Sequence, residues 1–185
     1  RDIRLSEERI QGYRNFMNKI WNAFRFCSLH FSLSERPSDT LQSLSLELAD
    51  RWILSRLQGV IADTRRALAE YRFNDAANGL YQFFWHEFCD WYLEIAKLHL
   101  SGTDQERSTR QAVLLHVFEI SLRLMHPLIP FITEDLWQQM PHVGETIVKA
   151  PYPTVEPKWH DEEAERKLDF LKDVVTAIRN IRGSM

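Results

Sequence analysis

The chain of 185 residues is poor in cysteine and glycine and has no excess of basic residues. Its two cysteines, Cys27 and Cys89, lie in apolar stretches and do not have the pattern of a set of disulfide bonds. This is typical of a protein from a reducing compartment. The six glycines form no phosphate-binding loop, so nucleotide hydrolysis and dinucleotide binding are not expected here. The net charge of −3 gives no general attraction to a polyanion, so any nucleic-acid contact has to be local.

Long hydrophobic runs are also missing. No apolar run approaches the roughly 18 residues of a membrane-spanning helix, and the first residues lack the pattern of a signal peptide. We therefore expect a cytoplasmic protein without membrane contact. The length suits a single domain, and the chain opens at Arg1 without an initiator methionine and stops directly after an amphipathic run. These features predict one domain, residues 1–185, excised from a larger multidomain protein.

The histidines and the cysteines do not have the spacing of a metal site or a catalytic site. Di-metal bundles use Glu-x-x-His pairs, whereas His116-x-x-Glu119 has the reversed order and occurs once. Cys89 lies in an aromatic segment, which favours a buried small side chain over a nucleophile. The sequence therefore predicts no metal, no cofactor and no catalytic residue within this chain.

Hydrophobic residues make up 44% of the chain and aromatic residues 12%, as in a packed globular protein. Apolar side chains recur at steps of three and four over most of the sequence, and polar or proline-containing stretches separate these segments. The pattern predicts helices at about 6–32, 49–71, 73–100 and 105–126, and two more that begin at about 130 and 161. Residues 141–159 are predicted to form an irregular connection, in which 146–149 is the one candidate for an extended segment. The expected fold is all-α, an antiparallel helical bundle.

The helix predicted at 73–100 carries aromatic rings on nearly every side between Phe83 and Tyr92. Such a helix is contacted by several neighbours, so we expect it to lie at the centre of the bundle. It also carries three carboxylates at helical spacing, which we expect to pair with Arg or Lys of a neighbouring helix rather than to act as acid and base: Glu87, Asp90 and Glu94.

The first predicted helix has two different faces. Its apolar stripe consists of Ile10, Tyr13, Met17, Ile20, Phe24, Cys27 and Phe31. The opposite face carries Asn15, Asn18, Lys19, Asn22, Arg25 and Phe26. Amides and an arginine hydrogen-bond to base edges, and an aromatic ring offers a stacking plane for a base. Periodicity alone equally allows a ring packed on a neighbouring helix among solvated amides, so this pattern leaves the role of the face open.

Several segments, in this order, resemble the anticodon-binding helical domain of class I aminoacyl-tRNA synthetases. These segments are Arg14–Phe26, Leu48–Leu57, Phe83–Glu94, His126–Trp137 and Ala177–Arg182. The string His126-Pro-x-x-Pro-Phe131 is shared with the isoleucyl and leucyl families and identifies only the class. The strings Asn18-Lys-x-Trp-Asn-Ala-x-Arg-Phe26 and Phe88-Cys-Asp-Trp-Tyr-Leu-Glu94 favour the valyl-tRNA synthetase family.

The resemblance implies that this chain is a non-catalytic piece that recognises the anticodon stem-loop of tRNA-Val. The parent enzyme would be a valine–tRNA ligase that uses ATP and Mg²⁺, both bound elsewhere, and its catalytic domain would belong to the same chain. Neither His-x-Gly-His nor Lys-Met-Ser-Lys-Ser, the two catalytic signatures of the family, occurs in these residues. We expect a monomer. The alternatives are the anticodon-binding domain of an isoleucyl-tRNA synthetase or a helical protein-interaction module.

The resemblance also assigns roles on the first helix. It implies that Phe26 stacks on a splayed base of the anticodon loop, which has a central adenine in valine tRNAs. The neighbouring polar side chains are then expected near base edges and phosphates: Asn15, Lys19, Asn22 and Arg25. Arg25 could instead brace a carboxylate of the bundle, and Arg179 and Arg182 could be a solvated helix end.

Overall fold

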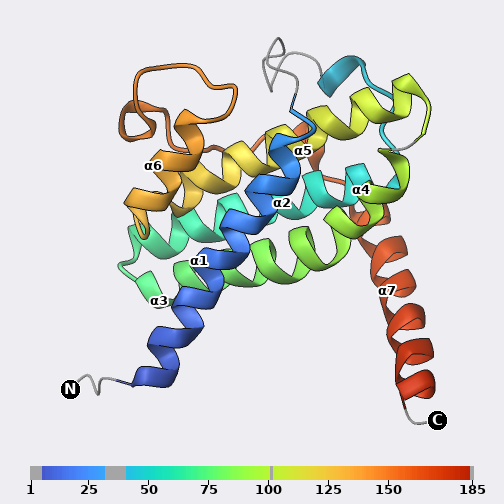
Figure 1. Cartoon of the computed structure of the whole chain (residues 1–185), viewed down its shortest axis with the longest axis horizontal. Helices are drawn as coiled ribbons and strands as arrows, with labels where there is room; N and C mark the ends of the chain where they lie inside the picture. The colour runs from blue at the N-terminus through green and yellow to red at the C-terminus, as the bar shows by residue number, and fades with distance from the viewer. Residues whose placement is uncertain (1–5, 32–40, 101, 184–185) are drawn as a thin grey trace.

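The computed structural model describes residues 6–31, 41–100 and 102–183. This part of the chain consists of helices and loops and contains no strand, which confirms the predicted all-α class (Figure 1). The longer elements are α1 (Glu7–Ser28), α2 (Leu48–Ala69), α3 (Phe73–Tyr81), η2 (Gln82–Tyr92), α4 (Leu93–His99), α5 (Asp104–Met125), α6 (Pro130–Gln138) and α7 (Glu162–Gly183). Three single 3₁₀ turns are η1 (Leu41–Ser43), η3 (Ile147–Lys149) and η4 (Pro157–Trp159).

Among the described helices, none is long and apolar enough to cross a membrane. The extended segment predicted at 146–149 was wrong, because η3 occupies Ile147–Lys149. No strand of the described chain lies beside this segment to pair with it. Instead, the Glu134 carboxylate accepts hydrogen bonds from the Ile147 N–H at 3.1 Å and from the Thr146 hydroxyl at 2.9 Å, and this holds the turn against α6.

Two helical segments form the middle of the bundle. On α5, 15 of the 22 residues are buried, more than on any other described helix, so this helix is enclosed by neighbours on several sides. The segment predicted as the central helix contributes buried rings from η2, including Phe84 and Phe88, which meet Phe118 of α5 at centroid distances of 5.6 and 6.0 Å. The core therefore lies between α5 and η2.

The continuous helix predicted at 73–100 is divided into α3, η2 and α4, because η2 is π-helical. In a π-helical segment the backbone hydrogen bonds join residues i and i+5. The side chains that follow it are therefore rotated around the helix axis relative to those of a regular α-helix. The side chains of α4 consequently point in directions that a uniform 3.6-residue period does not predict.

The two terminal helices project beyond the bundle at one end each. Figure 1 shows the start of α1 and the end of α7 projecting from the same side of the molecule. On α1, Ile20, Phe24 and Cys27 are buried as predicted, but Ile10 and Tyr13 are 51% and 66% exposed. The predicted core stripe is therefore wrong for the first turns, since periodicity marks a face but does not show where the covering neighbour ends.

A buried polar cluster joins α2, η2 and α5. The Asp50 carboxylate is fully buried and accepts hydrogen bonds from the Tyr92 hydroxyl at 2.7 Å and from the buried Arg110 guanidinium. Arg110 also donates to Glu47 Oε2 at 2.9 Å, and Asp50 Oδ2 accepts from the Glu47 backbone N–H at 3.0 Å. Burial and the neighbouring Asp50 carboxylate raise the pKa of the Tyr92 phenol well above its ordinary value.

This cluster predicts a large effect of removing its cation. Arg110→Met leaves the buried Asp50 carboxylate without its positive partner, and such a change costs about 3 to 5 kcal/mol. Urea unfolding monitored by circular dichroism measures the loss. The matched control is Arg107→Met on the same helix, because the ion pair of Arg107 with Asp104 is exposed and contributes about 0 to 1 kcal/mol. An R110M free energy of unfolding within about 1 kcal/mol of the parent value would contradict the assignment.

A buried histidine predicts a pH dependence of stability. His116 on α5 is 5% exposed, and burial lowers its pKa to about 4. Because the unfolded chain has a histidine pKa of about 6.5, it takes up a proton between pH 6.5 and pH 4 that the folded chain does not bind. The stabilising contribution is therefore fully present above about pH 6.5 and is lost as the pH falls towards about 4, by about 3 kcal/mol in total.

Urea unfolding at a series of pH values tests this expectation. His116→Gln should flatten the fall in stability between about pH 6.5 and pH 4, whereas His160→Gln at an exposed position should leave the slope of the parent chain unchanged. Equal slopes for the parent chain and H116Q would show that His116 is not buried in its neutral form.

Candidate nucleic-acid interface

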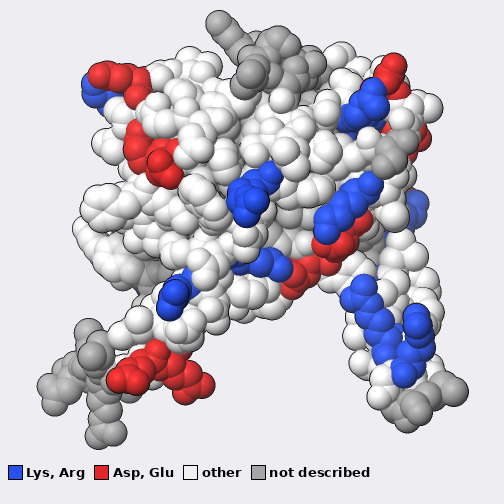
Figure 2. Space-filling model, in the orientation of Figure 1, with Lys and Arg blue, Asp and Glu red and all other residues white. Residues whose placement is uncertain are grey.

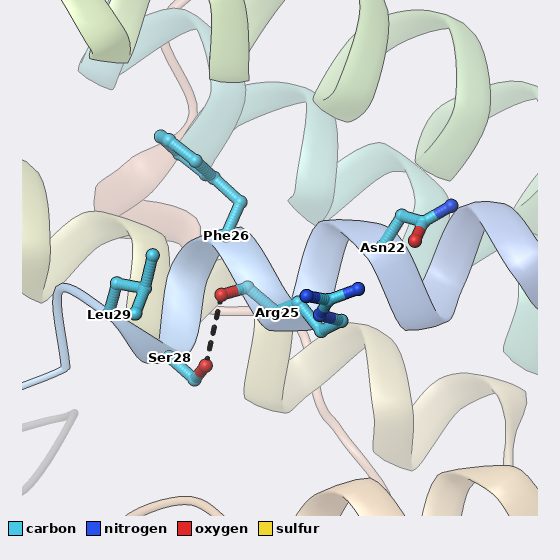
Figure 3. Close-up of a pocket in the computed structure, with 5 residues that line it drawn as sticks. All are labelled: Asn22, Arg25, Phe26, Ser28 and Leu29. Carbon is cyan, nitrogen blue, oxygen red and sulfur yellow. Dashed lines mark hydrogen bonds between the residues drawn. The ribbon is translucent and has the colours of Figure 1, made fainter.

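A hollow of about 440 Å³ lies along the last turns of α1, on the face that the sequence singled out. Figure 3 shows the five side chains that line it, with Phe26 and Leu29 rising from the helix, and Arg25 and Asn22 farther towards its N-terminus. The Ser28 hydroxyl donates to the Arg25 carbonyl oxygen at 3.1 Å, which keeps this turn closed. The structure therefore brings together three of the five predicted residues, Asn22, Arg25 and Phe26.

Phe26 is half-buried and has defined neighbours on two sides. The Lys97 Nζ of α4 lies 5.5 Å from its ring centroid, and the His30 ring meets it edge-on at 5.1 Å between centroids. A cation near an aromatic face is attracted to the ring electrons, and this contact restricts the orientation of the ring. The ring is thus held in place by packing while part of it faces the hollow.

The polar side chains beside the ring are not used by the fold. Asn22 and Arg25 are exposed, and in the described part of the chain neither side chain has a hydrogen-bond or carboxylate partner. The alternative in which Arg25 braces a carboxylate of the bundle is therefore wrong for the described residues. An unpaired amide and guanidinium next to a ring can bind a base edge and a phosphate without breaking existing contacts.

The other two predicted residues lie farther along the helix. Lys19 donates to Asp90 Oδ1 at 2.8 Å and its Nζ lies 5.1 Å from the Trp85 ring centroid, so its charge is already compensated. Asn15 accepts a hydrogen bond from the Gln11 amide at 3.0 Å. It precedes Phe26 by 11 residues, or about 16 Å along the helix axis. Neither residue lines the hollow.

Sequence reasoning missed the residue that α4 brings to this face. Lys97 reaches Phe26, and the next residue of α4, Leu98, is 77% exposed. Lys97 forms an ion pair with Glu94 at 2.6 Å, an ordinary helix-surface contact that gives no sign of a binding role. The exposed leucine at the end of an otherwise buried aromatic segment was the one signal that could have marked this turn of the helix.

Basic side chains gather at two places on this side of the molecule. Figure 2 shows Lys and Arg side chains along α1 and on the projecting end of α7, while acidic side chains lie at the start of α1 and near the middle of the same view. Arg14 and Arg25 of α1 have no carboxylate within 4 Å in the described chain. Local groups of basic side chains on a chain of net charge −3 agree with the expectation that any polyanion contact is local.

Comparisons with known proteins agree on one family. Residues 50–185 match the family model described as the anticodon-binding domain of tRNA ligase. The whole chain aligns at 48% identity with valine–tRNA ligases of Syntrophotalea carbinolica, over 190 aligned positions, and of Geobacter sulfurreducens, over 188. The valine–tRNA ligase of Geobacillus stearothermophilus is 41% identical over 189 positions, again across the whole chain. The alignments cover 21% of each relative, so this chain spans about a fifth of their length.

A solved structure shares the fold. The LeuRS of the Agrobacterium radiobacter K84 agnB2 LeuRS–tRNA–LeuAMS ternary complex superposes with a TM-score of 0.63 and 18% identity. The match covers 86% of this chain and 18% of that one. At this identity the likeness shows a common arrangement of helices.

The three carboxylates of the η2–α4 region are all paired. For Glu87 and Asp90 the cation lies on another helix, as predicted, whereas Glu94 pairs with Lys97 of its own helix α4. Glu87 accepts two hydrogen bonds from the Arg56 guanidinium, both at 2.8 Å, while Asp90 pairs with Lys19 and Glu94 with Lys97. Such charge-assisted hydrogen bonds hold the carboxylates in place, which suits a structural role.

One group of side chains has the composition of a metal site. Ligand atoms of Glu47, His99 and Glu106 lie within 4.8 Å of one another. Glu47 already accepts from Arg110 at 2.9 Å, and Glu106 closes the start of α5 through the Thr103 backbone N–H at 2.8 Å. The positive Arg110 guanidinium beside this group works against a second cation, so we assign these residues to the support of the helix ends.

The two cysteines predict a simple reactivity test. Both are buried, and burial raises the pKa of the Cys89 thiol to about 12 and that of Cys27 well above its usual value. Because the thiolate is the reactive form, neither thiol should react with a disulfide reagent such as dithionitrobenzoate at neutral pH in the folded chain. Both should react once urea unfolds it. Rapid labelling of a cysteine in the native chain would contradict this picture.

Proposed function

The chain belongs to the family of anticodon-binding domains of tRNA ligases, and we propose that it recognises the anticodon stem-loop of tRNA-Val as one domain of a longer valine–tRNA ligase. The family resemblance found in the sequence is thereby confirmed. The isoleucyl alternative loses support, because the relatives at 48% identity are valine–tRNA ligases.

The observation that carries the proposal is the hollow at the end of α1. It places a half-buried ring, Phe26, beside two polar side chains that the described chain leaves without partners, Asn22 and Arg25. Sequence-specific recognition of RNA targets unpaired loop bases, which stack on aromatic rings and present their edges to amides and guanidinium groups. These three side chains supply both kinds of contact within two helical turns.

In the proposed complex, a loop base enters the hollow and stacks on Phe26. The Asn22 amide, which both donates and accepts, reads the base edge, and the Arg25 guanidinium binds an adjacent phosphate. Lys97 lies over the ring and is paired with Glu94, so in this complex it holds the ring in position. Asn15 and Lys19 lie outside the hollow. They would contact the sugar-phosphate backbone of the RNA farther along the stem-loop.

The remaining steps of the parent enzyme belong to other domains in this proposal. ATP and Mg²⁺ would be bound by a catalytic domain of the same polypeptide, and the residues described here would deliver the anticodon contact. We further propose that the parent enzyme is a cytoplasmic monomer, which agrees with two free buried cysteines and with a role in translation.

A protein-interaction module is the second candidate, because an exposed leucine lines the same hollow. Leu29 is 80% exposed, and an apolar peptide could bind it. The unpaired Asn22 and Arg25 in the same lining argue for a polar ligand.

Replacing the ring should weaken RNA binding. Phe26→Ala removes a stacking platform that contributes about 1 to 3 kcal/mol, so the affinity for the valine anticodon stem-loop should fall about tenfold or more. Fluorescence anisotropy with a labelled stem-loop measures the affinity, and the parent chain should prefer this RNA to one with the central loop adenine replaced.

Tyr13→Ala is the matched control, since Tyr13 is an exposed aromatic residue on the same helix but lies well away from the hollow. Phe26→Trp keeps a stacking surface and should retain most of the affinity, which separates lost stacking from lost folding. An F26A affinity equal to that of the parent chain would refute the role of the ring. If RNA fails to bind the parent chain and an apolar peptide does bind, the second candidate is correct.

A further inference from the structure

Most cations of the described residues are compensated by a carboxylate. Each lysine of the described residues lies in an ion pair. The arginines of the same residues that have no carboxylate within 4 Å are Arg14, Arg25, Arg65, Arg166, Arg179 and Arg182. Four of these six lie on α1 or on the projecting end of α7, so the uncompensated charge is concentrated on the two terminal helices.

The end of α7 is unusually basic for an acidic chain. From Val174 to Gly183 it carries Arg179 and Arg182 and no acidic residue, and all but one of these ten positions are exposed. At 100° per residue, the two arginines lie about 60° apart around the helix and therefore share one side. Figure 2 shows basic side chains of this helix on the same face of the molecule as those of α1.

Arg179 is also held in place by a neighbouring helix. Its guanidinium carbon lies 5.6 Å from the ring centroid of Trp91, a half-buried residue of η2. This cation–π contact leaves the guanidinium N–H groups without a carboxylate partner in the described chain, so they are free to bind a phosphate. An arginine held against a ring loses less conformational freedom on binding than a fully solvated one, so this position is prepared for an anion.

We propose that Arg179, held by Trp91, and Arg182 form a second RNA contact, which binds backbone phosphates of the anticodon stem while the hollow on α1 takes a base of the loop. This inference rests on the proposed function and extends it to the double-stranded part of the same ligand. A stem presents closely spaced phosphates in a fixed row, which suits two arginines on one side of a rigid helix. The hollow then provides sequence discrimination, and α7 provides affinity and orientation.

The salt dependence of binding tests the proposal. Each phosphate contact contributes a little less than one unit to the slope of log affinity against log salt concentration. The double variant Arg179→Ala/Arg182→Ala in the full chain should lower this slope by about 1.5 for the valine anticodon stem-loop and should weaken binding roughly tenfold at low salt. Its preference for the central adenine over a substituted loop base should stay at the parent value, since no loop contact is lost.

Arg166→Ala is the matched control. It removes the same charge from the same helix, but its position lies about 140° and 160° around the helix from Arg179 and Arg182, so it should leave the slope unchanged. Arg179→Lys/Arg182→Lys keeps both charges and should retain the slope, which excludes a loss of folding as the cause. Trp91→Leu should weaken stem-loop binding less than the double variant, because the charge stays and only its orientation is lost.

The outcomes separate this inference from the proposed function. An unchanged slope in the double alanine variant, or an equal fall in R166A, would overturn the second contact. If the parent chain prefers the valine loop and F26A abolishes that preference while the double variant behaves as the parent chain, only the second contact is wrong. If the parent chain has no preference for the valine loop at all, the proposed function itself fails.

Discussion

The ion pair between Asp50 and Arg110 is the constraint on which the rest of the structure depends. Both side chains are almost completely inaccessible to water, and the Tyr92 hydroxyl completes the contact, so one carboxylate fixes α2, η2 and α5 relative to one another. A buried charge of this kind is tolerated only when its partners are in place, because its desolvation costs several kcal/mol. The cluster therefore specifies one arrangement of three helices, where apolar packing alone would allow several.

This arrangement determines where the binding face forms. With η2 fixed against α5, α4 extends alongside the end of α1 and brings Lys97 to the ring of Phe26. Rings then position α1 itself: Phe24 meets Phe118 of α5 at 5.9 Å, and Phe16 meets Tyr81 at 5.0 Å. The five residues that line the hollow all come from the end of α1, and α4, which is distant in sequence, supports it through the contact of Lys97 with Phe26.

The distribution of charge explains how an acidic chain could bind an anion. Carboxylates neutralise the cations that support the fold, such as Arg56 beside Glu87. These ion pairs therefore add little to the electrostatic potential outside the protein. The arginines left over lie mainly on the terminal helices, whose ends extend beyond the bundle. Net charge is therefore a poor guide to partners for a protein of this kind, whereas the positions of unpaired charges are informative.

The sequence by itself determined the all-α class, the approximate helix limits, the burial of Cys27 and Cys89, and the family, because periodicity, caps and motif strings are local properties of the chain. It also indicated the face of α1 that carries Asn22, Arg25 and Phe26. Periodicity could not show that Ile10 and Tyr13 lie beyond the bundle, nor that Lys19 is occupied by Asp90. The tertiary structure alone decided those points, the contact of Lys97 with Phe26 and the contact of Arg179 with Trp91, because each depends on which helices meet in space. For Lys97 the π-helical segment adds a change in side-chain direction that a uniform helical period does not predict.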